Sequence, residues 1–331
     1  MPSSASLRTV PIWSNSESTR PDNTPRPARS ALTRASGFLV GFTHSLNPYT
    51  GCRFACSYCY VQGLSLHRFH HPTLPWGDYA HPRAGIAEQL ERELARHARR
   101  GALDRLAVLM SSVTDPYQPL ERHWRLSRAC VQTLLRYPPA LLNVQTRSPL
   151  VQDDYPLLSE LGERCWLNFT METDLEEVRR AVTPRCPPLE ARLDALRRAR
   201  RMGLNVQITV SPCLPYSSVQ RFGELLLDLG NRVIVDTFTT GDGQHGVRTA
   251  NTTIPSIYAE RGWGDWRAEH AARELYLWLR ERIGDRAGWS QQGFAALPRL
   301  ALGTQAQPTD RPDDLPQDTT IDCSTPGQDL I

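Results

Sequence analysis

Three cysteines stand close together near the start of the chain, and their spacing is the strongest chemical signal in the sequence. Cys52, Cys56 and Cys59 follow a C-x3-C-x2-C pattern in the segment NPYTGCRFACSYCYVQG. Thiolates are the ligands that iron–sulfur clusters require, and a cube of four irons takes four of them. Since this motif offers three thiolates, one iron stays open to a small molecule. The spacing therefore predicts a [4Fe–4S] cluster with an open coordination position.

A zinc site is the alternative for the same cysteines. Zinc would take its fourth ligand from His67, His70 or His71, in the polar loop that follows. Zinc sites usually show C-x2-C twice, and the chain lacks the second unit. A disulfide framework is not indicated either, because the remaining cysteines are scattered along a long chain: Cys130, Cys165, Cys186, Cys213 and Cys323. The iron–sulfur cluster is the favoured interpretation.

Six short, mostly apolar segments are predicted to be strands buried on both faces, as in a parallel sheet. They span residues 38–45, 106–112, 141–146, 165–170, 205–211 and 232–236. The segments between them repeat apolar residues at helical spacing, for example at Ile86, Leu90 and Leu94. Strict alternation of strands and helices indicates a parallel α/β architecture, and six units fit a partial (β/α)6 TIM-like barrel. A doubly wound sheet is the alternative from the pattern alone.

The two ends of the chain carry no apolar periodicity and are rich in polar residues and proline. We therefore expect a disordered arm at residues 1–35 and a disordered tail at residues 305–331. Between them the pattern predicts a core domain at 36–262 and a helical extension at 263–304. The last amphipathic helix, at about 266–283, is expected to pack across the open side of the barrel. In either parallel architecture ligands gather at the carboxyl ends of the strands.

The composition excludes several kinds of chemistry and location. All 38 basic residues are arginines, which excludes a lysine Schiff base, a lysine general base and a P-loop lysine. The formal net charge of +3 is too small to indicate nucleic-acid binding by itself. No segment approaches the length of an apolar membrane span, and the start of the chain lacks the continuous apolar region of a secretory signal. We therefore expect a cytoplasmic protein with no membrane role.

The cysteine segment resembles the radical S-adenosylmethionine (SAM) superfamily, in which C-x3-C-x-(aromatic)-C follows the first strand of an α/β barrel. Cys52, Cys56, Tyr58 and Cys59 fill its four positions. Other stretches resemble the branch related to spore photoproduct lyase, over roughly residues 40 to 240: SSVTDPYQPLE at 111–121, NVQTRSPLVQDD at 143–154 and ITVSPCLPYSS at 208–218. The resemblance implies that a reduced [4Fe–4S] cluster cleaves SAM to methionine and a 5′-deoxyadenosyl radical, which abstracts hydrogen from a substrate.

The same resemblance implies which residues contact SAM. Thr114 and Asp115 stand where the family contacts the SAM amino group, and a carboxylate is a suitable acceptor for an ammonium. A Thr-Asp-Pro turn would explain both residues without a ligand. Arg147 stands where the family often has lysine near the SAM carboxylate, and a guanidinium can grip a carboxylate with two bonds. Tyr58 is expected beside the adenine, and Ser211 is expected to line the adenosine pocket.

The sequence departs from the branch at the hydrogen donor. Spore photoproduct lyase uses a cysteine, two residues before the position of Thr114, to return a hydrogen atom to thymine, and this chain has Ser112 there. A serine O–H bond is far too strong to donate a hydrogen atom as a thiol does. Tyr60 and Cys213 are the remaining candidates for a catalytic residue. The plain alternatives are packing on the cluster loop for Tyr60 and a small buried apolar side chain for Cys213.

The resemblance implies an external one-electron reductant of the flavodoxin or ferredoxin type, and it suggests DNA or another nucleic acid as a substrate. Two other functions stay open from the sequence. One is modification of a peptide or protein by the same radical chemistry, and the other is a non-catalytic module that binds zinc or iron. The sequence identifies neither the substrate nor whether SAM is consumed or regenerated.

Overall fold

A curved parallel sheet organises the chain in the computed structural model, which describes residues 21–64, 67 and 74–303. The strand order is β11-β10-β9-β8-β7-β6-β3-β2, and β2 alone runs antiparallel to its neighbour. The strands are β2 (Leu32–Arg34), β3 (His44–Leu46), β6 (Ala107–Met110), β7 (Leu141–Thr146), β8 (Cys165–Thr170), β9 (Asn205–Val210), β10 (Arg232–Val235) and β11 (Ala287–Trp289). The predicted α/β class and partial barrel are confirmed.

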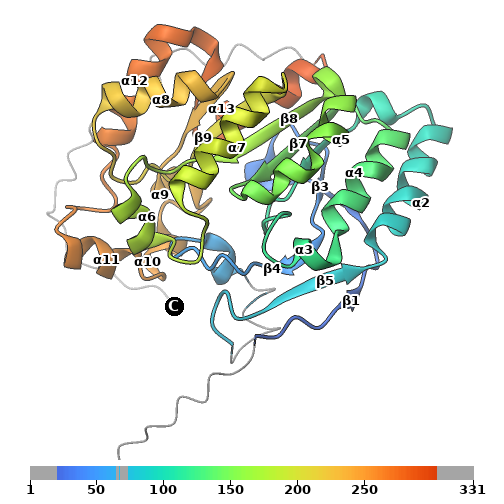
Figure 1. The fold of residues 1–331 in the computed structure, drawn as a ribbon, viewed down its shortest axis with the longest axis horizontal. Helices are drawn as coiled ribbons and strands as arrows, with labels where there is room; N and C mark the ends of the chain where they lie inside the picture. Colours follow the sequence, from blue (N-terminus) through green and yellow to red (C-terminus); the bar gives the residue numbers. More distant parts are fainter. Residues whose placement is uncertain (1–20, 65–66, 68–73, 304–331) are drawn as a thin grey trace, which may run out of the picture.

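Helices cover the outer face of the sheet (Figure 1). The covering helices are α2 (Ile86–Arg99), α4 (Leu126–Arg136), α5 (Tyr155–Glu160), α7 (Leu189–Arg201), α8 (Val219–Leu229) and α12 (His270–Ile283). Of the other long helices, α6 (Glu176–Val182) and α11 (Ile254–Arg261) pack in the cluster that contains the cysteine segment, and α13 (Ser290–Ala301) lies at the base of the interior. One-turn helices complete the connections: α3 (Glu121–Trp124), α9 (Phe238–Gly241) and α10 (Val247–Ala250), with the 3-10 helices η1 (Gly37–Leu39), η2 (Tyr60–Gly63), η3 (Leu103–Arg105), η4 (Pro149–Asp154), η5 (Gly162–Arg164) and η6 (Gly284–Arg286). In the described part of the chain, no helix is both long and apolar enough to cross a membrane.

Alternation along the strands separates two environments. Outward-facing residues such as Val108 and Met110 join Leu90 and Leu134 of the covering helices in the main apolar core. The residues between them point into the barrel, because successive side chains of a strand face opposite sides of the sheet. On β6 the inward residues Ala107 and Leu109 belong to a separate cluster. The apolar runs of the central strands are thus explained by burial on both faces.

The first of the predicted parallel strands, β3, begins later in the chain than the pattern predicts. The expected strand at 38–45 is instead the 3-10 helix η1 followed by a turn, and β3 begins only at His44. Gly37 and Gly41 have φ of 60° and 95°, which an extended strand does not allow. The apolar residues of this run pack elsewhere, since Phe38 contacts the ring of Phe294 in α13.

The expected disordered arm at residues 1–35 overlaps ordered structure. Residues 21–35 contain β1 (Arg26–Pro27) and β2, and the backbone N–H groups of Ala31 and Leu32 donate to the carboxylate of Glu93 on α2. β1 also joins a small sheet in the order β1-β5-β4, with β4 (Tyr49–Gly51) and β5 (Ala80–Ala84). The order of residues 21–35 was not predicted, because contacts made by backbone atoms leave no apolar pattern in the sequence. Residues 1–20 and the expected tail at 305–331 lie outside the described residues.

The segment after residue 262 continues the same sheet. α12 connects β10 to β11 and packs against both strands and α8, so it extends the wall and does not cross the open side of the barrel as we expected. The short strand β11 has too few residues to give a recognisable pattern. α13 then closes the base of the interior, where Leu297 packs with Phe42, Leu109 and Leu141.

Candidate radical SAM site

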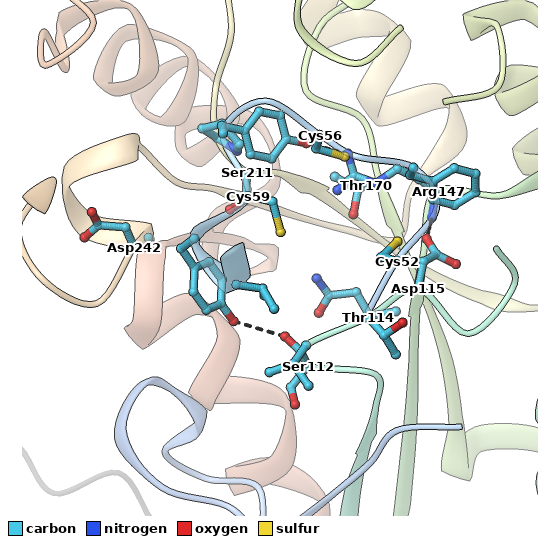
Figure 2. A pocket seen from close by; sticks show the side chains of 18 of the residues that line it. Cys52, Cys56, Cys59, Ser112, Thr114, Asp115, Arg147, Thr170, Ser211 and Asp242 are labelled. Carbon is cyan, nitrogen blue, oxygen red and sulfur yellow. Dashed lines mark hydrogen bonds between the residues drawn. The ribbon is translucent and has the colours of Figure 1, made fainter. Parts of the chain in front are cut away.

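A cavity opens at the carboxyl ends of the strands and contains the residues singled out by the cysteine motif. About 850 Å³ of empty space, part of it open to solvent, lies between its walls. Figure 2 shows the sulfur atoms of Cys52, Cys56 and Cys59 around the same space. The predicted residues that line it are Cys52, Cys56, Tyr58, Cys59, Tyr60, Thr114, Asp115, Arg147 and Ser211. All the predicted site residues except Cys213 are therefore brought together at one edge of the sheet.

The loop that carries the cysteines is anchored by side chains from the end of β6. Thr114 donates its hydroxyl to the carbonyl of Gly51 at 2.6 Å, and the amide of Gln118 donates to the same carbonyl at 3.3 Å. Gln118 also accepts from the backbone N–H of Arg53 at 2.9 Å. Gly51 has φ of 82°, and a Cβ there would lie 2.7 Å from the carbonyl of Tyr79. The loop thus depends on a glycine at this position, and Thr114 supports the loop.

A fourth cysteine, Cys186, lies beside the motif although it is far away in sequence. Its Sγ is 3.7 Å from that of Cys56. The segment that carries it is held by Arg179 of α6, whose Nη1 donates to the carbonyls of Thr183 and Cys186 at 3.0 and 2.8 Å. The thiol of Cys186 lowers the pKa of Cys56 by hydrogen bonding; burial opposes this effect and Arg147 adds to it. Sequence reasoning missed Cys186, because no local spacing signals it.

The motif cysteines are free thiols in unequal environments. None of the described cysteines forms a disulfide. Burial raises the pKa of the thiols of Cys52 and Cys59, the latter to about 12, while that of Cys56 is lowered. Within residues 21–64, 67 and 74–303, no three Cys, His, Asp or Glu side chains are close enough to hold a single metal ion. A four-iron cube binds each thiolate to a different iron and so tolerates wider spacing than one tetrahedral ion.

Of the histidines proposed for a zinc site, only His67 is described, and it forms no metal-binding group with the described cysteines. His67 hydrogen-bonds to the hydroxyl of Tyr79 at 3.0 Å and packs edge-on against Trp76. His70 and His71 lie outside the described residues. The described donor set therefore fits a cluster on three thiols better than zinc.

A buried ionic network fixes the wall behind the cysteine loop. Glu172, directly after β8, accepts from Arg147, from the hydroxyl of Tyr58 and, at 2.6 Å, from Arg192. Burial would raise the pKa of Glu172, but Arg147 and Arg192 outweigh it and lower the pKa to about 2. The carboxylate does not line the cavity, so it acts on the site by positioning Arg147 and Tyr58. Sequence reasoning did not find Arg192, a fully buried charge on α7.

Asp115 forms the predicted turn and still faces the cavity. Its carboxylate accepts from the hydroxyl of Thr146 at 2.7 Å and from the backbone N–H groups of Tyr117 at 2.9 Å and Arg147 at 3.0 Å. Burial raises the pKa of this carboxyl, although these three donors act against it. A carboxylate offers about four acceptor positions, so about one stays available to a ligand.

Ser211 and Cys213 differ in what they can reach. Ser211 lines the cavity and donates its hydroxyl to the carboxylate of Asp236 at 3.2 Å. Cys213 does not line the cavity; it packs on the apolar core and burial raises its pKa to about 12. Cys213 therefore does not fit a hydrogen-donating role, and it is better explained as a buried apolar side chain.

Tyr60 faces Ser112 across the cavity. Its hydroxyl donates to the backbone carbonyl of Ser112 at 3.0 Å, the bond drawn as a dashed line in Figure 2. The guanidinium of Arg248 lies 5.9 Å from the centre of its ring. Burial raises the pKa of Tyr60 to about 12, so the phenol stays protonated at neutral pH.

Several polar residues of the cavity were not predicted, among them Ser111, Gln145 and Thr170. Gln145 and Thr170 make no side-chain hydrogen bond with a described residue, and the hydroxyl of Ser111 is buried without a partner. Gln145 lies near the end of β7, directly after Val144 of the outer apolar core. A polar residue inside an otherwise buried strand was a signal that sequence reasoning could have used.

Comparison with known proteins agrees with this geometry. Residues 46–229, more than half of the chain, match the radical SAM superfamily. The chain is 34% identical over 182 residues to an uncharacterized protein, ORF301, of Acidianus two-tailed virus, covering 53% of this chain and 58% of that protein. It is 26% identical over 190 residues to an uncharacterized protein, Rv2578c, of Mycobacterium tuberculosis. That match covers 56% of this chain and 54% of that protein. The chain thus spans less than two thirds of these relatives.

The fold is also similar to solved structures of spore photoproduct lyase. The complex with dinucleoside spore photoproduct has a TM-score of 0.55 and 12% identity, and the similarity covers 80% of this chain and 79% of that one. At this identity the likeness shows the fold alone. Together with the match to the family, the α/β partial barrel and the three thiols at its mouth place the protein in one group: the chain belongs to the radical SAM superfamily, whose enzymes use a [4Fe–4S] cluster, SAM and an electron donor.

Proposed function

We propose that Cys52, Cys56 and Cys59 hold the [4Fe–4S] cluster and that the adjoining cavity binds SAM together with the substrate. The observation that carries this proposal is that three free thiols and several unpartnered polar groups line the same cavity at the strand ends. When bound, the cluster and SAM supply a radical that removes a hydrogen atom from the substrate. The chain's own residues hold the reactants in place and exclude water.

Two charged residues suit the polar end of SAM. Asp115 has an acceptor position left for the ammonium after its three hydrogen bonds within the chain. Arg147 donates from Nη1 to the hydroxyl of Tyr58 and to the carboxylate of Glu172. Its other side-chain N–H groups donate to no described residue. Those groups are available to a carboxylate, and the buried partners keep the guanidinium in one orientation. Thr114 supports this end of the site through the cluster loop.

We further propose that the substrate is a nucleic-acid base. The fold is shared with an enzyme solved with a dinucleoside photoproduct. In this chain the cavity combines the rings of Trp76 and Phe238 with the free carboxamide of Gln145. Aromatic rings stack on bases, and a carboxamide offers the donor and acceptor pair that base edges require. Peptide modification remains the competing outcome of the test below.

For the return of a hydrogen atom we propose Tyr60. By the resemblance to spore photoproduct lyase, Ser112 stands in the place of the thiol donor. The phenol O–H of Tyr60, a weaker bond than that of serine, lies against the carbonyl of Ser112. The substrate radical takes the hydrogen atom of the phenol, and a tyrosyl radical remains. One electron from the external reductant and one proton from solvent then restore the phenol, so atoms and electrons balance.

The test of the substrate is isotope transfer. The reconstituted enzyme is given SAM, dithionite and UV-irradiated oligonucleotides deuterated in their thymine bases. We expect deuterium in 5′-deoxyadenosine and loss of a thymine lesion. Unlabelled 5′-deoxyadenosine with every DNA and RNA tested, but labelled product with a deuterated peptide, would contradict the nucleic-acid substrate.

A further inference from the structure

A second hollow lies on the other side of the cysteine loop. About 1070 Å³ of empty space, part of it open to solvent, lies within it, and its lining includes residues of α3, η4, α7 and the segment 185–188. Phe54, between the first two cysteines of the motif, lines both this groove and the cavity described above. No other residue is common to the two linings. A partner in the groove would therefore leave the cavity free for SAM and substrate.

The groove reaches the proposed cluster ligands. Cys186 lies in its wall, and its Sγ is 3.7 Å from that of Cys56. Phe54 is itself part of the cysteine loop and is almost wholly buried. A protein seated in the groove would be separated from the proposed cluster by the thickness of one loop.

The rim of the groove is positively charged. Arg122, Arg185 and Arg198 line it and are exposed. The side chains of Arg122 and Arg198 form no ion pair with a described residue, whereas Arg185 pairs with Asp78 at 2.8 Å. Asp153, the acidic residue of the lining, is already paired with Arg125 at 3.3 Å. Such a surface attracts an acidic partner and accelerates its association.

The groove is also rich in rigid, apolar residues. Four prolines line it: Pro119, Pro149, Pro187 and Pro188. Proline loses little conformational freedom on binding, so a preformed surface of this kind adds little ordering cost to an encounter. Electron-transfer partners form small, short-lived interfaces of this character, steered by charge.

We propose that this groove docks an acidic one-electron carrier of the flavodoxin or ferredoxin type. The inference rests on the proposed cluster ligation, and it adds the place where the electron enters. The carrier gives up one electron and the cluster gains one, and no atom is transferred. The path runs past Phe54 and Cys186 to Cys56, so the carrier approaches from outside the SAM cavity.

The experiment compares three anaerobically reconstituted proteins: the wild type, Arg122→Glu/Arg198→Glu and the control Arg201→Glu/Arg221→Glu. The control changes two exposed arginines that do not line the groove, so both variants have the same net charge. Reduction of the cluster by flavodoxin hydroquinone is followed by stopped-flow bleaching of its visible absorption at low and high salt. Isothermal titration of each protein with flavodoxin measures binding directly.

We expect the groove variant to be reduced about tenfold more slowly at low salt, to lose most of its salt dependence and to bind flavodoxin correspondingly more weakly. The control should stay close to the wild type, and dithionite should reduce all three equally. Equal reduction of the groove variant and the wild type by flavodoxin, or equal slowing of the control, would overturn the docking site. Absence of 5′-deoxyadenosine after dithionite reduction would instead contradict the proposed function, so the two failures are distinguishable.

Discussion

The two ends of the barrel interior are built from the same strands but from different kinds of side chain. At the base, Ala107 and Leu109 of β6 and Leu141 of β7 form an apolar cluster with Leu297 of α13. At the mouth, the same two strands and the loop after β6 present Ser111 and Gln145 to the cavity. Conformational stability and chemistry are thus separated along the length of one sheet, as is general in parallel barrels. Mutations at the two ends should therefore have separable effects.

The largest effect is expected from the cysteines at the mouth. Cys56→Ser should lower 5′-deoxyadenosine formation at least about 100-fold, because the thiolate ligand is lost. The iron and sulfide content after reconstitution should fall with it. Cys213→Ser is the matched control, since Cys213 does not line the cavity. Full cluster content in Cys56→Ser would contradict the ligand assignment.

The next effect concerns the ionic network that supports the mouth. Glu172→Gln leaves the buried charges of Arg147 and Arg192 without their carboxylate and should destabilise the protein by about 3–5 kcal/mol in urea unfolding. Glu190→Gln, at an exposed pair on α7, should change stability by less than about 1 kcal/mol. If Glu172→Gln lost no more stability than the control Glu190→Gln, the network would be unimportant for stability.

The same network predicts a direction of acid sensitivity. The pKa of Glu172 falls from its ordinary value of 4.5 to about 2 on folding, so its contribution is complete above pH 4.5 and is lost as the pH falls toward 2. Stability measured in urea between pH 6 and 2 should fall less steeply in Glu172→Gln than in the wild type. Parallel curves for the two proteins would contradict the lowered pKa.

At the base, Leu297→Ala should cost about 2–4 kcal/mol of stability while cluster content and SAM cleavage per folded protein stay at the wild-type level. The cavity left by the leucine lies among Phe42, Leu109 and Leu141, away from the cysteines. Thermal unfolding gives the first quantity, and iron analysis with 5′-deoxyadenosine assays gives the second. Loss of cluster from folded Leu297→Ala would show that the two ends are coupled.

The smallest effect is expected for Tyr60→Phe, which removes a single hydroxyl. Cluster content and 5′-deoxyadenosine formation should be unchanged, whereas substrate turnover should fall about tenfold because the hydrogen donor is missing. Formation of a substrate-derived side product is the readout that a packing role would not produce. Unchanged turnover with the same product would leave Tyr60 as a packing residue only.

The sequence was most informative where the signal is local. The segments predicted for β7 and β8 match the strands residue for residue, because strands buried on both faces are continuous apolar runs. The expected strand at 38–45 was wrong because Gly37 just before this equally apolar run and Gly41 within it have positive φ. Local patterns do not reveal such a turn, nor do they place the short β11.

Within the site, the motif residues were predicted by spacing and by family resemblance, and their hydrogen bonds were not. Arg147 was expected to face SAM, but its main partner is Glu172, which the chain brings in from the end of another strand. Cys186 lies 130 positions after Cys56 and meets it only through the fold. Contacts of this range depend on tertiary packing, which periodicity does not encode.

The central claim is that three thiols hold a cluster whose open iron meets SAM in the adjoining cavity. Its most direct test is electron paramagnetic resonance of the reconstituted, dithionite-reduced protein before and after addition of SAM. We predict the signal of a reduced [4Fe–4S] cluster that shifts when SAM binds, and 5′-deoxyadenosine on longer incubation. A cluster signal that SAM leaves unchanged, with no 5′-deoxyadenosine formed, would contradict the account.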